Sequence, residues 1–178
     1  MYYTGQGDTG SSKLFNSSSR LAKSEQIFVV LGTLDELNSY LGFASTFSEQ
    51  ETQILVALKR EQDNLFTLQA HFAKAQLTIS PDLIINLEAD INKWEKEISP
   101  INNFIVPGGS KLSAILDIAR TIARRAEREA LSLNTEIRIS YNKLAFVYLN
   151  RLSSWLYVLA RLANYKTEQP EITPQYNK

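Results

Sequence analysis

The sequence has no cysteine, and this absence removes several kinds of protein chemistry together. Without thiols there is no disulfide framework, no thiolate metal site and no cysteine nucleophile. Histidine is almost as scarce, since His71 is the single one, and one imidazole is a poor metal site. His71 lies beside Phe72 within a predicted helix, and we interpret it as structural rather than catalytic. The chain therefore offers no histidine or cysteine around which an active site would be built.

Long apolar runs and an excess of one charge are also missing. No apolar run reaches the roughly 18 residues that a membrane span needs. Lysine plus arginine total 19, as do aspartate plus glutamate, so no overall field attracts nucleic acid or a membrane surface. The first ten residues are polar and glycine-rich, without the pattern of a signal peptide or presequence. We expect a cytoplasmic protein that binds neither nucleic acid nor membranes.

What the sequence does contain is helical periodicity along most of its 178 residues. Apolar residues make up 44% of the chain, which is ordinary for one globular domain with a full core. They recur at three- and four-residue steps in five segments. These predicted helices cover residues 25–47, 49–75, 81–98, 110–130 and 139–166. No repeat or β-rich region interrupts them, so we predict an all-α bundle of five helices with short loops.

The segments outside the bundle differ in composition from the helices. Residues 1–24 hold three of the seven glycines and many hydroxyl side chains, and residues 167–178 contain two prolines and no periodicity. We treat residues 1–24 as a glycine- and serine-rich loop, 25–166 as the bundle domain and 167–178 as a mobile tail. The last predicted helix is apolar on more than one face, which predicts packing against a second subunit as well.

The glycines of the N-terminal loop point to phosphate binding. Gly5, Gly7 and Gly10 permit tight left-handed turns, and such a loop with flanking hydroxyls can wrap phosphate oxygens with its N–H groups. It is not a Walker loop, because the glycine-lysine-serine/threonine ending is missing and no apolar strand precedes it. A flexible arm without a ligand is the alternative interpretation.

Residues 104–128 form the most informative stretch, in which a Pro-Gly-Gly break precedes an arginine-rich helix. Ser110 is the predicted N-cap of that helix. Its charged stripe consists of Asp117, Arg120, Arg124, Glu127 and Arg128. Arginines four residues apart suit several phosphate or carboxylate groups of one ligand. The alternative is a solvated face held by ion pairs such as Glu127 with Arg124.

The opposite face of the same helix is rich in alanine, which lets another helix approach closely. The arginine stripe would then lie in a seam, where an arginine needs an anionic partner. Asp35, in the first predicted helix, is the natural candidate for a buried or intersubunit pair. Gly32 in that helix costs about 1 kcal/mol relative to alanine, which predicts close packing at that point.

Four blocks of sequence together resemble a known family. They are YTGQGDTG near the start, GTLDELNSYLGFA at 32–44, FIVPGG followed by ARTIARRAERE, and YLNRLSSWLYVLAR at 148–161. In this order and spacing, which spans most of the chain, they resemble the PduO-type ATP:corrinoid adenosyltransferases.

The resemblance implies a homotrimer of five-helix bundles, with a ferritin-like fold and an active site at each subunit interface. The implied reaction transfers the 5′-deoxyadenosyl group of ATP to the cobalt of cob(I)alamin, giving adenosylcobalamin and triphosphate. Magnesium would accompany the ATP and be held mainly by its phosphates, so no protein ligand for the metal is assigned. A reductase or an adenosylcobalamin-dependent enzyme would be a further partner.

The resemblance also implies roles for individual residues. The implied ATP-binding residues are Thr4, Gly5, Gln6, Gly7, Asp8, Gly10, Ser12, Lys13, Lys23, Arg124, Arg125, Glu127, Arg128 and Asn150. Of these, Arg124, Arg128 and Asn150 carry the catalytic role. Phe104 matches an aromatic residue that lies against the lower face of the corrin and keeps the axial base off cobalt. Asp35 and Arg120 match a salt bridge between subunits.

Three positions depart from the pattern of that family. Gly5 replaces a cation near the phosphates, Asp117 replaces a common histidine, and Ser154 replaces an aspartate. Lys13 is a candidate to restore the lost cation. Two alternatives therefore stay open beside the enzyme: a non-catalytic sensor or carrier that binds ATP or corrinoid, and a helical bundle whose arginine stripe is only an interface.

Overall fold

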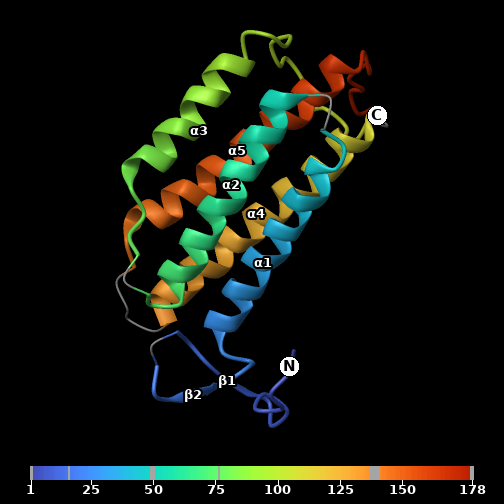
Figure 1. The fold of residues 1–178 in the computed structure, drawn as a ribbon. Helices are drawn as coiled ribbons and strands as arrows, with labels where there is room; N and C mark the ends of the chain where they lie inside the picture. The colour runs from blue at the N-terminus through green and yellow to red at the C-terminus, as the bar shows by residue number, and fades with distance from the viewer. Residues whose placement is uncertain (1, 16, 49–50, 76, 137–140, 177–178) are drawn as a thin grey trace.

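Five helices dominate the computed structural model, which describes residues 2–15, 17–48, 51–75, 77–136 and 141–176. They are α1 (Gln26–Ser45), α2 (Thr52–Phe72), α3 (Pro81–Trp94), α4 (Lys111–Glu136) and α5 (Lys143–Lys166). Helix α4 packs against both α1 and α5, while α2 packs on α1 and α3 on α5 (Figure 1). The predicted bundle of five helices is confirmed.

The starts of three helices follow from their capping residues. The Ser80 hydroxyl accepts the Asp82 N–H at 3.2 Å, and the Ser110 hydroxyl accepts the Ser113 N–H at 3.1 Å. The Asn142 side chain does the same for Leu144 at the start of α5. Each bond satisfies a backbone N–H that has no partner within its own helix. The N-cap predicted at Ser110 is therefore confirmed.

Several helix bounds differ from the predicted ones. Helix α4 continues to Glu136, past the end predicted at residue 130. Helix α3 ends at Trp94 and not at residue 98, although Ile98 is still buried. A turn after Trp94 carries Ile98 into the core, so its position continues the apolar pattern without continuing the helix. Helix α5 begins at Lys143, and the start predicted at residue 139 lies outside the described residues.

A short β-hairpin in the N-terminal segment was not predicted. Strand β1 (Ser11–Lys13) pairs antiparallel with β2 (Arg20–Ala22), so that Ser11 faces Ala22 and Lys13 faces Arg20. The hairpin lies at the end of the bundle where α1 begins (Figure 1). Leu14 is buried against the core and anchors the hairpin there. The sequence predicted a loop over residues 1–24, but part of this segment is a folded hairpin.

Alanines on α4 bring the neighbouring helices close, as predicted. Their side chains are fully buried at Ala119, Ala123, Ala126 and Ala130. Because these side chains are small, α1 and α5 can both pack against α4, the central helix of the bundle. The remaining face of α4 carries the arginine stripe.

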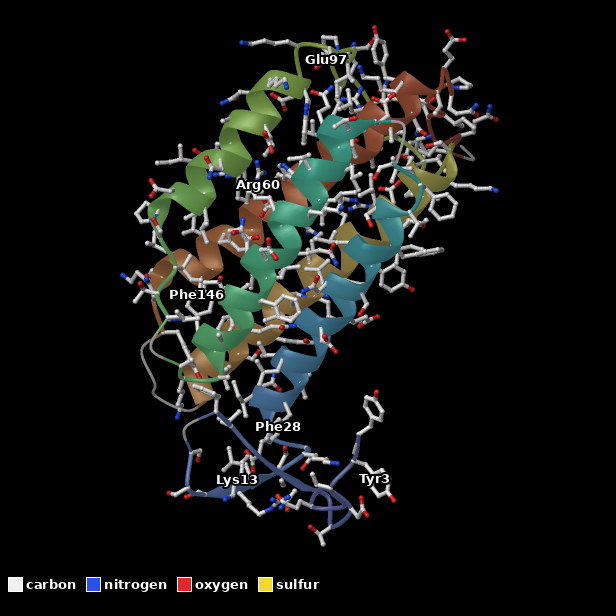
Figure 2. The ribbon with its side chains drawn as sticks, viewed as in Figure 1. Tyr3, Lys13, Phe28, Arg60, Glu97 and Phe146 are labelled. Atoms are coloured by element: carbon white, nitrogen blue, oxygen red, sulfur yellow. The ribbon has the colours of Figure 1, made fainter. Side chains whose placement is uncertain are left out.

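A buried polar network joins α2, α3 and α5. Glu61 is fully buried and accepts hydrogen bonds from the Tyr148 hydroxyl at 2.7 Å and the Asn64 amide at 3.0 Å. Arg60, labelled in Figure 2, contacts Glu61 at 2.7 Å and Asp90 of α3 at 2.6 Å. Burial, together with the Glu61 charge, raises the pKa of Tyr148 well above its usual value. The network stabilises α3 against the bundle because each buried charge has partners.

The C-terminal segment, expected as a mobile tail, makes defined contacts with the bundle. Buried Arg161 of α5 pairs with Glu171 through two contacts of 2.6 and 2.8 Å. The Ile172 carbonyl accepts the Val106 N–H at 2.7 Å. These bonds hold the tail beside the segment that precedes α4 (Figure 1). Among the described helices, none combines the length and apolarity needed to span a membrane.

Candidate functional site

A cavity of about 1030 Å³ lies between α4, α5, the end of α3 and the segment that follows it. Its wall includes Ile91, Glu95, Asn102, Asn103, Phe104, Ile105, Arg120, Arg124, Ser153, Ser154, Tyr157, Thr173 and Pro174. The cavity therefore brings together Phe104, Arg120 and Arg124, which the sequence analysis identified for different reasons. The C-terminal segment contributes part of the wall, which the sequence did not predict.

Phe104 presents its ring to this cavity instead of the core. Its side chain is 80% exposed, although most large apolar side chains of the chain are buried. The backbone beside it is fixed, because the Val106 N–H is bound by the Ile172 carbonyl and a Pro-Gly-Gly turn follows. An exposed aromatic ring on a fixed backbone is suited to contact the flat face of a ligand.

The turn between Phe104 and α4 requires both of its glycines. Gly108 and Gly109 have φ angles of +122° and +106°, and a Cβ at Gly109 would collide with the Asn164 amide. Asn164 donates to the Gly108 carbonyl at 2.8 Å and accepts the Ser110 N–H at 2.9 Å. The turn is therefore clamped to α5. Sequence reasoning missed Asn164, because its partners lie 54 and 56 residues away.

Arg120 and Arg124, one helical turn apart on α4, differ in how they are held. The Arg120 Nε donates to Asp117 at 3.2 Å, and its guanidinium lies 5.7 Å from the centre of the Tyr157 ring. The guanidinium of exposed Arg124 has no hydrogen-bond or ion-pair partner within the described parts of the chain. The ion pair with Glu127, considered from the sequence, does not form. Arg124 thus offers its full donor set to a ligand.

The next part of the stripe is linked to α1 and α5. Arg125 pairs with Glu36 of α1 and lies 3.8 Å from Glu129. Glu127 accepts a hydrogen bond from the Asn150 amide of α5 at 2.9 Å. Of the predicted ATP-binding residues on α4 and α5, Arg125 is therefore already neutralised within the chain. Glu127 and Asn150 are held together, as a shared site requires.

The glycine loop of the N-terminal segment is closed by Lys23. Gly5 and Gly10 have φ angles of +68° and +75°, which side chains rarely adopt. A Cβ at Gly7 would lie 3.0 Å from the Lys23 Nζ, so glycine lets the ammonium group approach the loop. The Lys23 N–H also donates to the Gly10 carbonyl at 2.8 Å. A lysine amine held against a glycine-rich loop is an arrangement suited to phosphate.

Arg20 organises the same loop and was not identified from the sequence. Its Nε donates to the Ser11 hydroxyl at 2.9 Å, and its Nη2 donates to the Ser11 carbonyl at 2.6 Å and to the Gln6 carbonyl. These bonds occupy two carbonyl oxygens that would otherwise repel an anion. No sequence motif marks Arg20, because the hairpin brings Ser11 and the Gln6 carbonyl beside it.

Within one chain the glycine loop and the cavity lie at different ends of the bundle. Strands β1 and β2 lie where α1 begins, and the C-terminal segment lies at the opposite end (Figure 1). Figure 2 shows Tyr3 and Lys13 in the hairpin region, and no residue of this segment lines the cavity. Of the predicted ATP-binding residues on α4 and α5, only Arg124 lines the cavity. In the described part of the chain no side-chain hydrogen bond or ion pair joins the glycine loop to these residues.

Asp35 and Arg120 also remain apart within one chain. Asp35 is exposed beside a second cavity of about 880 Å³, whose apolar lining includes Phe28, Leu31 and Phe66. Gly32 lines the same cavity, and a Cβ there would meet no atom within 4 Å. The close packing predicted at Gly32 is thus wrong within the chain. Within the described residues, no group of three or more histidine or carboxylate side chains could hold a metal.

Comparison with known proteins gives a consistent result. A family model described as cobalamin adenosyltransferase matches residues 2–163. The chain is 35% identical to a corrinoid adenosyltransferase of Mycobacterium leprae, with 91% of this chain and 90% of that protein covered. It is 34% identical to the corrinoid adenosyltransferase PduO of Salmonella typhimurium, which covers 99% of this chain. The chain spans only 53% of the Salmonella protein, about half its length.

A solved structure is similar along the whole chain. It is a variant PduO-type ATP:corrinoid adenosyltransferase from Lactobacillus reuteri in complex with cobalamin and ATP. The TM-score is 0.92 at 28% sequence identity, and the alignment covers 100% of this chain and 98% of the other.

Proposed function

The chain belongs to the cobalamin adenosyltransferase family, and we propose that it transfers the 5′-deoxyadenosyl group of ATP to the cobalt of cob(I)alamin. In this reaction Co(I) attacks the C5′ carbon with its electron pair. A cobalt–carbon bond forms, the bond between C5′ and the phosphate oxygen breaks, and triphosphate leaves with the electrons of that bond. The observation that carries the proposal is the cavity shared by Phe104, Arg120 and Arg124.

The size and lining of the cavity suit a corrinoid. Its volume of about 1030 Å³ is at the upper limit of ordinary small-molecule pockets, which are about 300–1,000 Å³. Phe104 would lie against the lower face of the corrin and exclude the axial base. Cobalt without an axial donor is easier to reduce to Co(I), so the ring prepares the nucleophile without taking part in bond formation.

Charge at the triphosphate comes from the arginine stripe and the glycine loop. Arg124 supplies an unpaired guanidinium, and Lys23 supplies an ammonium group beside Gly7. These cations stabilise the negative charge that collects on the leaving triphosphate as the C5′–O bond breaks. Because the leaving group needs no proton from a side chain, the scarcity of histidine is no obstacle. Magnesium would enter with ATP, bound to its phosphates.

A homotrimer would complete the site. Since the glycine loop and the cavity lie at different ends of one chain, the loop of one subunit would meet the α4–α5 face of the next. The exposed Asp35 would then reach Arg120 of a neighbouring subunit, and the apolar cavity beside Asp35 would be covered. The cytoplasmic location and a reductase partner stay predictions from the sequence.

A sensor or carrier that binds the same ligands without turnover is the second candidate. It is favoured by Ser154, which lies in the cavity wall with no carboxylate to offer, and by Gly5 in the phosphate loop. Restoring an aspartate with Ser154→Asp should create activity if this candidate is correct.

An anaerobic turnover assay, together with calorimetry for ATP binding, separates the enzyme, the sensor or carrier, and the interaction-only bundle. Purified protein is mixed with chemically reduced cob(I)alamin and magnesium ATP, and the loss of the Co(I) absorbance band and growth of the adenosylcobalamin spectrum are followed. Turnover supports the enzyme. ATP binding by calorimetry without turnover supports the sensor or carrier, and absence of both supports an interaction-only bundle.

A further inference from the structure

Asp117 lies where α4 meets the Pro-Gly-Gly turn, and it contacts both the turn and the cavity wall. The residue is only 9% exposed. One carboxylate oxygen accepts the Gly108 N–H at 3.1 Å, and the other accepts the Arg120 Nε–H at 3.2 Å. Asp117 stands in the second turn of α4, so it is not the cap of that helix, which is Ser110. Its two oxygens therefore join two parts of the site that are not neighbours in sequence.

The contact with Arg120 leaves most of that guanidinium available. Asp117 occupies the Nε edge, and the Tyr157 ring lies 5.7 Å from the guanidinium carbon. The four N–H bonds on the two terminal nitrogens have no hydrogen-bond partner among the described residues and remain for a ligand or a neighbouring subunit. Arg120 is thus oriented from within its own chain, before any ligand or neighbouring subunit arrives.

The contact with Gly108 restrains the segment between Phe104 and α4. Ser113 donates to the Gly108 carbonyl at 3.1 Å, while Asp117 binds the N–H of the same residue. With both polar groups of Gly108 held by α4, the chain between Phe104 and the helix has little freedom. A shift of Asp117 would therefore disturb both Arg120 and the turn that follows the Phe104 segment.

We propose that Asp117 is a positioning residue for adenosyl transfer, which holds Arg120 at the cavity wall and ties the Phe104 segment to it. This inference rests on the proposed function. A carboxylate is needed because two N–H donors approach from different sides and each requires an acceptor. The amide of asparagine has one acceptor oxygen, so Asp117→Asn would set an NH₂ group against one of the two donors.

The test compares Asp117→Asn, Arg120→Ala and the double variant as full-length proteins, with steady-state kinetics for cob(I)alamin and calorimetry for ATP. We expect Asp117→Asn to reduce kcat/KM for cob(I)alamin about tenfold, the effect of one lost charge-assisted hydrogen bond, with ATP affinity unchanged. Because part of the effect of Asp117 passes through Arg120, the loss in the double variant should be smaller than the product of the two single losses. Independent losses that multiply in the double variant would overturn the proposal.

Two further variants keep the result interpretable. Arg120→Lys keeps the charge but lacks the Nε–H, so it should also lower kcat/KM for cob(I)alamin, which tests the Arg120 contact even if Asp117→Asn folds poorly. Asp63→Asn removes the same charge from an exposed site on α2 and should behave as wild type.

Hydrogen exchange gives a readout that does not depend on turnover. The Gly108 amide should exchange faster in Asp117→Asn than in wild type and stay unchanged in Asp63→Asn. If wild type neither binds nor adenosylates cobalamin, the proposed function fails and this role fails with it. If wild type is active and Asp117→Asn equals it in kinetics and exchange, only the role of Asp117 is overturned.

Discussion

Arg124→Ala should weaken ATP binding while leaving the fold intact. The guanidinium of Arg124 is exposed and has no partner elsewhere in the described chain, so its removal breaks no ion pair or side-chain hydrogen bond there. Arg128 bonds to the Arg124 carbonyl at 2.9 Å, and that backbone atom remains in the variant. Any loss of function is then a loss of contact with ligand.

The size of the effect follows from the number of phosphate contacts. A hydrogen bond to a charged group contributes about 1.5–3 kcal/mol, and about 1.4 kcal/mol corresponds to a factor of ten in affinity. One lost contact therefore weakens ATP binding about 10- to 150-fold. Surface substitutions away from special features change the free energy of unfolding by about 0.5 kcal/mol or less, so Tm should move by only about 1–2 °C.

The assay is calorimetric titration with magnesium ATP, accompanied by thermal unfolding at a fixed protein concentration. Arg151→Ala is the matched control, because Arg151 is an arginine of the neighbouring helix α5 that pairs with Glu88 on α3, away from the cavity. It removes the same charge and should bind ATP as wild type does. Equal ATP affinity for Arg124→Ala and Arg151→Ala would refute the assignment of Arg124 to the triphosphate.

Three further changes test other parts of the structure. Arg20→Ala removes the hydrogen bonds that the Arg20 side chain makes with Ser11 and Gln6. It should weaken ATP binding about tenfold without affecting corrinoid binding, and unchanged calorimetry would contradict this. Gly109→Ala places a side chain at a φ of +106° against a neighbouring amide, so it should lower the free energy of unfolding by about 1–3 kcal/mol. Gly32→Ala, which meets no atom of its own chain within 4 Å, is its control in thermal unfolding, and equal losses would contradict the clash. Tyr148 has a raised pKa in the folded state, so its contribution to stability is complete below about pH 10 and falls by up to about 1.4 kcal/mol per pH unit above it. The free energy of unfolding of Tyr148→Phe should not show this decrease at alkaline pH. If denaturant titrations between about pH 9 and 11.5 gave the same pH dependence for both proteins, the role of Tyr148 would be contradicted.

Several features of the fold could be predicted because their signal is local. Apolar spacing marked each helix, and Ser110 marked the start of α4, since a cap and its helix are adjacent in sequence. The hairpin could not be predicted in this way, because strands of three residues show no period. The contacts of the tail, such as Glu171 with Arg161, depend on where α5 ends in space and not on spacing along the chain.

The residues of the candidate site also fall into those that could be predicted from the sequence and those that could not. The resemblance pointed to Phe104, Arg120 and Arg124, and the structure places all three on one cavity. The resemblance could not point to Asn164 or Arg20, whose hydrogen bonds are made mainly with backbone atoms of other segments. The pairing of Asp35 with Arg120 stays a prediction about the assembly, because the two do not meet within one chain.

By itself, the sequence determined the helical bundle, the family and the position of the arginine stripe on one helix face, because each depends on periodicity or on blocks of contiguous residues. Only the tertiary structure decided which arginine is available to a ligand. Arg125 is paired with Glu36, 89 residues earlier, whereas the guanidinium of Arg124 next to it has no partner in the described chain. Adjacent side chains on a helix point about 100° apart, so the packing of α1 against α4 neutralises one arginine and leaves the other free.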